Sequence, residues 1–336
     1  MFDSDFESKV TKLLFGYIWK STEWVSRTTI VRPRHEGGLA VYEIQSRLAA
    51  LRGAHICRLI SGPPARWHTF AAYWIGLQLR NWRADLASNS RPHSEFEMPE
   101  YYSTALKTFK MVYSNTPTKS VLLQRCVKTI YSHLISRHTS TIIAVRRMPH
   151  IQFESTWRHI YKSPLSAGPR DVCWRICHSV IPVRGFLSKF QRMRSDRCPL
   201  CAMDVEYVSH LFHSCIMVKR LWFIINTWLS AITRSTVKLS IEQALFFNFV
   251  HWSTEHIRIA TVLSSELLYA IWIIRNEVVF DHKRKSTIDI ERLFRHRVRW
   301  RIKTDFVRLN RQTFIDLWCN ANVLAAIQGD FVTTLV

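Results

Sequence analysis

Residues that form tight turns are scarce in this sequence. Only 9 of its 336 residues are glycine and 11 are proline. Sandwiches and barrels of β-strands need such residues at short, regular intervals, so this scarcity argues against an all-β fold. Hydrophobic residues make up 47% of the chain and aromatic residues 12%, which suffices for sizeable cores. We therefore predict a mainly α protein composed of bundle-like helical modules.

The sequence also lacks a secretory signal and a long apolar run. Residues 1–7 carry neither the positive charge nor the apolar stretch of a signal peptide. The strongest apolar run, residues 267–274, ends at Arg275 and falls far short of the roughly 20 residues that cross a bilayer. We therefore expect neither secretion nor a transmembrane helix.

The eight cysteines are too dispersed for the disulfide framework of a small secreted protein. Reduced thiols inside a cell fit this pattern better. We expect an intracellular protein, nuclear or cytoplasmic, and the short basic run at residues 282–285 is compatible with nuclear import.

Acidic side chains are few relative to basic ones, 25 against 47, which gives a formal net charge of +22. Such a charge favours a polyanionic partner, most often nucleic acid. An anionic membrane surface is the alternative, but we expect no membrane partner, because the apolar stripe of residues 288–309 should pack on the rest of the protein. Many of the basic side chains fall between residues 283 and 311 and would follow a helix face, although such a face can also simply be solvated. The predicted nucleic-acid contacts are Arg192, Arg194, Arg197, Lys283, Arg284, Lys285, Arg292, Arg295, Arg299 and Lys303.

Apolar residues recur at intervals of three and four over several stretches, which is the spacing of amphipathic helices. The predicted helices span residues 6–20, 41–60, 172–180, 221–232, 258–280 and 288–309. Trp67, Trp74 and Trp82 would share one further helical face. Such a stripe can stack nucleobases, but aromatic residues at helical spacing are usually buried, and we favour a core role for these three.

Four residues have the spacing of a metal site, C-x2-C-x8-H-x4-C: Cys198, Cys201, His210 and Cys215. Two cysteines separated by two residues can direct both thiolates at one ion from a tight turn, and Pro199 suits such a turn. A full set of Cys and His ligands describes a closed tetrahedral site without an open position for water. The pattern therefore predicts one structural Zn²⁺ in a small Cys3His module.

Alternatives exist for this set. His213 competes with His210, because it lies on the same predicted helix and close to the last cysteine. The cysteines could also be ordinary buried thiols. Cys173, Cys177 and His178 form a second group, but no second pair at matching spacing accompanies it, and we interpret these thiols as core.

Further motifs surround the cysteines. They are Trp157, Trp174-Arg175-Ile176-Cys177-His178, Ile181-Pro182, Asp196-Arg197-Cys198-Pro199-Leu200-Cys201, Glu206, His210-Leu211-Phe212 and Leu221-Trp222. Together they resemble the reverse transcriptase zinc-binding domain that lies downstream of the polymerase in non-LTR (LINE-type) retrotransposon proteins. Two weaker resemblances to regions flanking that domain are Phe15-Gly-Tyr-Ile-Trp19 with Arg32-Pro33 and Glu36-Gly37-Gly38-Leu39, and Ile271-Trp272-Ile273-Ile274-Arg275-Asn276 with Phe280.

The chain departs from that family in one respect. Such polymerases bind two catalytic metal ions on palm aspartates, usually in an aromatic-x-Asp-Asp motif, and no adjacent Asp-Asp pair occurs here. The resemblance therefore implies a truncated product without the palm and without polymerase activity. A nuclease is also disfavoured, since the sequence has no His-Glu-x-x-His motif and no phosphate-cradling glycine loop.

These features predict four segments. They are a post-thumb-like segment at 1–61, a helical connector at 62–150, the zinc-binding domain at 151–225 and a basic C-terminal helical region at 226–336. The expected function is non-catalytic binding of RNA or DNA by a retrotransposon remnant. The alternative is a structural or protein-interaction module that binds zinc but no specific nucleic acid.

Overall fold

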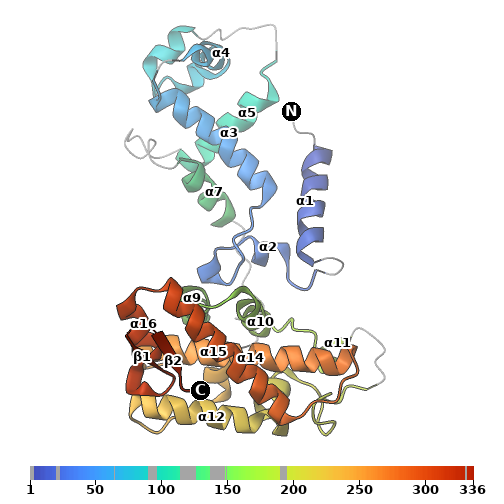
Figure 1. The fold of residues 1–336 in the computed structure, drawn as a ribbon. Coiled ribbons are helices and arrows are strands. Elements are labelled where there is room, and N and C mark those ends of the chain that lie inside the picture. Colours follow the sequence, from blue (N-terminus) through green and yellow to red (C-terminus); the bar gives the residue numbers. More distant parts are fainter. Residues whose placement is uncertain are drawn as a thin grey trace. The chain divides into compact units, whose positions relative to one another are not determined.

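The computed structural model describes residues 4–19, 23–63, 65–89, 97–113, 126–136, 148, 150–189, 195–329 and 331–336. The protein is mainly α-helical, as the sequence predicts (Figure 1). Its chain packs into two units. Unit 1 comprises Met1–Arg32 and Gly38–Ser140, and unit 2 comprises Pro33–Gly37 and Thr141–Val336. The four segments expected from the sequence remain a prediction.

Unit 1 is organised around α3 (Ile44–Ser61), which packs against α5 (Glu100–Tyr113) and α7 (Cys126–Ser136). The three helices approach closely at Gly53, where a Cβ atom would lie 3.1 Å from the side chains of Thr108 and Ile130. The other elements are α1 (Ser4–Trp19), α2 (Arg27–Ile30), α4 (Arg66–Ile75), η2 (Leu77–Leu79) and η3 (Ala84–Asn89).

Trp67, Trp74 and Trp82 of unit 1 are partly buried and pack against its core, which confirms the core interpretation. They do not share one helix, so the predicted continuous stripe is wrong. Trp67 and Trp74 lie on α4, which ends at Ile75, and Trp82 follows η2. The helix stops at Gly76, where any side chain would collide with the carbonyl oxygen of Leu86.

Unit 2 is built around the long helix α14 (Thr254–Phe280). Against it pack α10 (Ala167–Cys177), α12 (Ile216–Thr233) and α15 (Thr287–Arg308). The remaining elements are η1 (Arg34–Glu36), α9 (Phe153–Lys162), α11 (Arg184–Leu187), η4 (His210–Ser214), α13 (Ile241–Phe246), α16 (Arg311–Trp318), η5 (Asn320–Asn322), β1 (Ala325–Gln328) and β2 (Phe331–Thr334).

Helix α14 is long and apolar enough to cross a membrane by length and composition alone. In the folded chain, however, 72% of its most apolar 18-residue window is buried. Its neighbours α10, α12 and α15 cover it on several sides. These observations fit a core helix.

Helix α15 begins and packs as its sequence predicts. Ser286 and Asp289 form a capping box, in which each side chain accepts a hydrogen bond from the other residue's backbone N–H. The apolar stripe then buries Ile290, Phe294 and Val298, together with Ile302. The helix is thereby fixed against α14 on one side, where Arg301 and Asp305 are buried as well, while exposed side chains such as Arg292 and Lys303 lie on its outer face.

A short N-terminal segment, Pro33–Gly37, belongs to unit 2 and packs on α9. The carbonyl oxygen of Gly37 accepts two hydrogen bonds, from Trp174 Nε1 at 2.9 Å and from His178 Nε2 at 2.8 Å. Gly37 has a φ of 86°, and a Cβ there would lie 2.6 Å from the ring of Trp157. Glycine is therefore required by both its backbone conformation and its packing.

Two local features differ from what the sequence predicts. The helix expected over residues 172–180 begins earlier, at Ala167, and ends at Cys177. Pro169 fits the first helical turn, where a missing N–H costs no hydrogen bond. The antiparallel hairpin of β1 and β2, which pairs Ala325 with Thr334, was not anticipated, because strands of four residues carry too little periodic signal.

Candidate metal centre and basic side chains

Cys198 and Cys201 lie on a short loop that is closed by backbone hydrogen bonds. The N–H of Cys198 donates to the carbonyl of Asp204 at 2.7 Å, and the N–H of Glu206 donates to that of Asp196 at 2.8 Å. Ala202 adopts a left-handed conformation with φ 57°. The loop therefore doubles back on itself and brings the two thiols to its inner side, as the C-x2-C spacing predicts.

The other two residues come from the following helical region. His210 opens η4, a single π-helical turn, and Cys215 follows it as the N-cap residue of α12. The wider π turn differs from the ordinary helix expected here, and π turns often accompany functional sites. It ends with the N–H of Cys215 donating to the carbonyl of His210 at 2.8 Å. This contact holds the two side chains on the same side of the chain.

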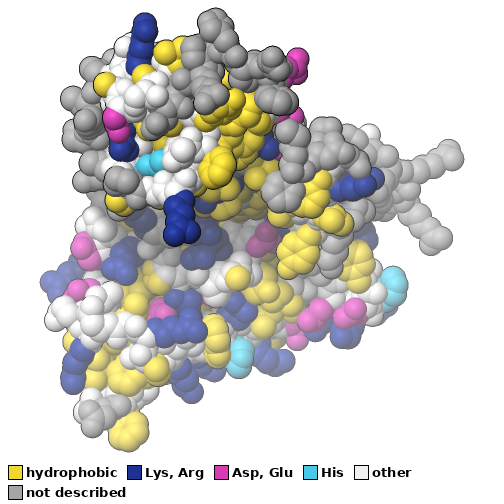
Figure 2. All heavy atoms as spheres, turned by 90° about the horizontal axis from the view of Figure 1, so that it is seen from above, with side chains coloured by type: hydrophobic (Ala, Val, Ile, Leu, Met, Phe, Trp, Pro, Cys, Tyr) yellow, Lys and Arg dark blue, Asp and Glu magenta, His cyan; other side chains and the backbone are white. Residues whose placement is uncertain are grey.

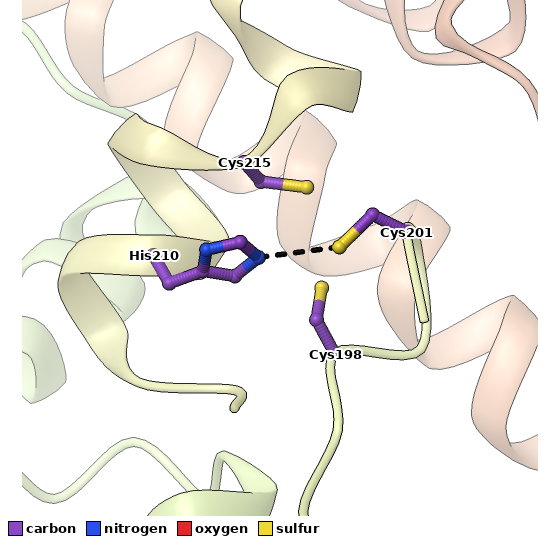
Figure 3. A group of neighbouring side chains, drawn as sticks. All are labelled: Cys198, Cys201, His210 and Cys215. Carbon is purple, nitrogen blue, oxygen red and sulfur yellow. Dashed lines mark hydrogen bonds between the residues drawn. The ribbon is translucent and has the colours of Figure 1, made fainter. Parts of the chain in front are cut away.

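The four side chains converge (Figure 3), and their donor atoms all lie within 4.8 Å of one another. His210 Nε2 is 3.3 Å from Cys201 Sγ. Tetrahedral zinc with Zn–S bonds of about 2.3 Å needs neighbouring sulfurs roughly 3.8 Å apart. The donor set and its spacing therefore fit a metal ion, and zinc suits three thiolates and one imidazole.

Hydrogen bonds inside the cluster also favour a thiolate. The contact with Cys215, opposed by burial and aided by the backbone N–H groups of Cys201 and Leu200, lowers the pKa of Cys198 to about 5. The same contact with Cys198 raises the pKa of Cys215. A thiolate is the form that binds metal, so the loop prepares at least one ligand for an ion.

An acidic side chain lies behind the histidine. Asp204 Oδ2 is 3.5 Å from His210 Nδ1, on the side of the imidazole ring opposite to the Nε2 that faces Cys201. Carboxylates in this position orient metal-binding imidazoles. Sequence reasoning did not single out Asp204, although it lies three residues beyond the second cysteine.

The alternative residues lie elsewhere. The described metal-binding set contains His210 and not His213, whose ring packs against Trp222. Burial lowers the pKa of His213. The thiols of Cys173 and Cys177 are fully buried in unit 2, and burial raises the pKa of each. They are core residues, as the sequence analysis favoured.

The metal-binding loop is tied to the core of unit 2 by a buried ion pair. Glu206 Oε1 accepts from Arg275 Nε at 2.7 Å, and Glu206 Oε2 accepts from Arg275 Nη2 at 3.0 Å and from the N–H of Arg184 at 2.6 Å. Arg275 also donates to the carbonyl of Pro182. The sequence analysis placed Glu206 and Arg275 in two separate motifs and did not predict their contact, which joins residues 69 positions apart.

The predicted nucleic-acid contacts do not form one uniform surface. Arg192 and Arg194 lie outside the described residues. Arg197 donates to the carbonyl of Met203 and so belongs to the loop itself. Other basic side chains of the predicted set are engaged within the protein: Lys283 with Asp281 at 3.1 Å, Lys285 with Glu277 at 2.5 Å, Arg295 with Glu291 at 2.9 Å, and Arg299 with the carbonyl of Val336.

Arg284, Arg292 and Lys303 remain exposed. Arg292 contacts Asp289 loosely, at 3.7 Å. Figure 2 shows Lys and Arg side chains dispersed among hydrophobic, acidic and other ones on the face it displays. The structure thus separates basic side chains that stabilise the fold from those that are available to an anionic ligand, a distinction that sequence alone did not make.

Comparisons with known proteins agree with this site. Residues 126–222 match the family described as zinc-binding in reverse transcriptase. The match runs from the start of α7 into α12 and includes all four residues of the cluster. It is a match to a zinc-binding domain and not to a polymerase catalytic region.

A curated relative points the same way. The chain is 30% identical over 114 residues to a protein of Xenopus laevis described as a Transposon TX1 uncharacterized 149 kDa protein. The match covers 32% of this chain and 9% of that relative. The geometry of the cluster, the family match and this likeness agree with one another: residues 126–222 are similar to the zinc-binding domain of reverse transcriptases, and part of the chain is similar to a transposon protein.

Proposed function

We propose that this chain is a non-catalytic, zinc-stabilised part of a retrotransposon protein that binds RNA or DNA through its basic surface. One Zn²⁺ would be held by Cys198, Cys201, His210 and Cys215. Because the protein supplies four ligands, the ion would fix the fold of the module and would keep no position for a reacting water. Intracellular localisation, nuclear or cytoplasmic, forms part of the proposal.

The observation that carries the nucleic-acid proposal is the outer face of α15. Arg292 and Lys303 are exposed along it, on the side away from the buried stripe. Among the residues that the structure describes, Lys303 has no acidic partner, and Arg292 contacts Asp289 only at 3.7 Å. Basic side chains along one helix can contact successive phosphates and release counterions.

Electrophoretic retardation of structured RNA and duplex DNA at low salt tests this function. We expect retardation that weakens steeply as salt rises, because counterion release dominates such binding. The charge-neutralising double variant Arg292→Gln with Lys303→Gln should bind less tightly. A matched control with the same loss of charge is Arg158→Gln with Lys162→Gln, two exposed residues of α9.

The outcome that counts against the proposal is plain. If the zinc-loaded wild-type protein slows the migration of neither structured RNA nor duplex DNA at low salt, nucleic-acid binding is not its function. If both double variants weaken binding equally, the α15 face has no special role and total charge explains the affinity.

The non-catalytic part of the proposal has its own support and test. The family match covers a zinc-binding domain, and the sequence contains no adjacent Asp-Asp pair. We expect no primer extension on an RNA template with Mg²⁺ and nucleotides. Template-dependent extension by the purified chain would contradict this part while leaving the zinc site unaffected.

A groove beside the metal centre favours the second candidate function, a protein-interaction module. It has a volume of about 900 Å³ and lies between α12 and the segment leading into α13, lined by apolar side chains that include Trp222, Phe223 and Leu239. Phe223 is 71% exposed. Retained zinc together with no nucleic-acid affinity would favour this candidate.

A further inference from the structure

A second, smaller cavity lies in unit 2, away from the four metal-binding side chains in sequence. Its volume is about 380 Å³, and it is formed where the first turn of α10 meets α14 and α15. Its lining includes Ser166, Gly168, Tyr269, Arg297 and Trp300. The size falls in the lower part of the range of cavities that hold small ligands, roughly 300–1,000 Å³.

The aromatic wall of the cavity includes Trp300, whose side chain is half exposed. Trp300 is 50% exposed, although α15 buries its apolar stripe on the opposite side. It lies on the same outer face as His296 and Lys303, one helical turn away from each. A half-exposed indole between basic neighbours offers a flat surface on which a nucleobase can stack.

The second aromatic residue is held in place by its neighbours. Tyr269 lies so close to Gly168 that a Cβ at that position would be 2.5 Å from Tyr269 Cζ. The guanidinium of Arg297 lies over the Tyr269 ring, 4.3 Å from its centroid. Glu266 fixes that guanidinium through Arg297 Nε at 2.8 Å and Nη2 at 2.7 Å. The cavity wall is thus ordered before any ligand arrives.

The polar wall lies at the start of α10. Ser166 is the N-cap residue, but its hydroxyl makes no capping hydrogen bond, and its buried Oγ has no partner among the described residues. That oxygen has almost no solvent-accessible surface, and Pro169 in the first turn carries no N–H, so the start of α10 closes this side of the cavity and is not an open anion site.

We infer that this cavity holds one unpaired nucleotide of a single-stranded nucleic acid, with its base on Trp300 and its phosphate toward the exposed Lys303, one helical turn away on α15. The inference rests on the proposed function and narrows it, because a base inside a duplex cannot enter such a cavity. Basic side chains on the outer face of α15 would then contact the phosphates of the nucleic acid on either side of the inserted base.

The test is fluorescence anisotropy with a labelled 12-nucleotide single-stranded oligonucleotide and, in parallel, a duplex of the same sequence. Trp300→Ala should weaken binding of the single strand about tenfold, since loss of one base–aromatic stack has an effect of this order. It should leave duplex affinity within about twofold. Trp300→Phe should retain most of the single-strand affinity, because the ring still offers a stacking face.

One further variant completes the set. Phe70→Ala is the matched control, because Phe70 is an aromatic side chain of unit 1 with 70% exposure. It should change neither affinity. Circular dichroism of each variant shows whether the fold is retained.

The possible results distinguish failure of this inference from failure of the proposed function. Equal single-strand affinity of wild type and Trp300→Ala overturns the inference, and so does an equal loss for single strand and duplex. Tight duplex binding without single-strand binding overturns the inference and leaves the proposed function standing. Failure of every nucleic acid to bind overturns both.

An independent readout locates the base directly. A single strand with one 5-iodouracil should, on irradiation, crosslink to the peptide that contains Trp300 or to the one that contains Tyr269. Crosslinks confined to other peptides would place the base elsewhere and overturn the inference.

Discussion

Glu206 and Arg275 form an ion pair in which both side chains are shielded from solvent, with 0% and 2% exposure. Glu206 immediately follows the loop that carries Cys198 and Cys201, and Arg275 lies on the central helix α14. The carboxylate also accepts the N–H of Arg184 at the start of α11. One side chain thus connects the metal-binding loop to two other parts of unit 2, so the position of the loop depends on this contact as well as on the ion.

Replacing Arg275 should be strongly destabilising. Arg275→Met leaves the Glu206 carboxylate buried without its partner, and we expect a loss of about 3–5 kcal/mol in the free energy of unfolding. Urea denaturation of the zinc-loaded protein measures it. The control Arg158→Met breaks an exposed pair with Glu154 and should cost less than about 1 kcal/mol. Similar effects of the two variants would mean that the buried pair does not anchor the loop.

Metal content should depend on the cluster and not on the other thiols. Cys215→Ser should reduce bound zinc below the one equivalent expected for the wild type, because the hydroxyl is a poor ligand for this ion. Cys319→Ser, outside the cluster, should leave the zinc content unchanged. Atomic emission after gel filtration measures both. Full zinc content in Cys215→Ser would exclude this residue as a ligand.

The buried His178 should make unit 2 sensitive to acid. Burial lowers its pKa to about 4, against the smaller opposing effect of its hydrogen bond to Gly37. The unfolded chain, with a histidine pKa of about 6.5, takes up a proton first as the pH falls. Stability is therefore fully present above pH 6.5 and is lost toward pH 4, by about 3 kcal/mol from this group.

The variant His178→Gln isolates that effect, because glutamine also donates a hydrogen bond and does not titrate. We expect the difference in unfolding free energy between wild type and variant to shift by about 3 kcal/mol from pH 7 to pH 4 in favour of the variant. Acid effects on the thiolates are shared by both proteins and cancel. A difference that stays constant with pH would show that His178 does not titrate in this way.

Salt dependence should report individual phosphate contacts on α15. Lys303→Gln should lower the slope of log affinity for duplex DNA against log salt by about 0.9, the contribution of one contact. Lys162→Gln, on α9, should leave the slope unchanged. Titrations between low and moderate salt provide both values. An unchanged slope for Lys303→Gln would remove this residue from the contact surface.

Periodicity predicted the long helices of unit 2, α12, α14 and α15, to within a few residues. The apolar stripe from Ile290 to Ile302 is buried as expected, since side chains three and four apart must share a face. The Cys198 and Cys201 turn was also predictable, because a short spacing restricts where two thiols can point. Both inferences depend on residues that are near one another in the chain.

Long-range contacts were beyond that reasoning. The pairing of Glu206 with Arg275 depends on how helices pack, and periodicity says nothing about which charged residues meet. The number of basic residues between 283 and 311 also overstates how many can meet an anionic ligand, because Lys283, Lys285 and Arg295 form ion pairs within the protein. Exposure, which decides whether an arginine can meet a phosphate, emerges only from the packed chain.

The carbonyl of Gly37 has a consequence for how this protein can be divided. It is the acceptor for Trp174 and His178, yet it lies 137 and 141 residues earlier in the chain than these two donors. A fragment that begins at residue 126, where the family match starts, would lack this carbonyl. It would therefore leave two buried N–H groups without an acceptor. Supplying residues 33–37 as a separate peptide should then restore stability to such a fragment, because unit 2 is assembled from two stretches of chain.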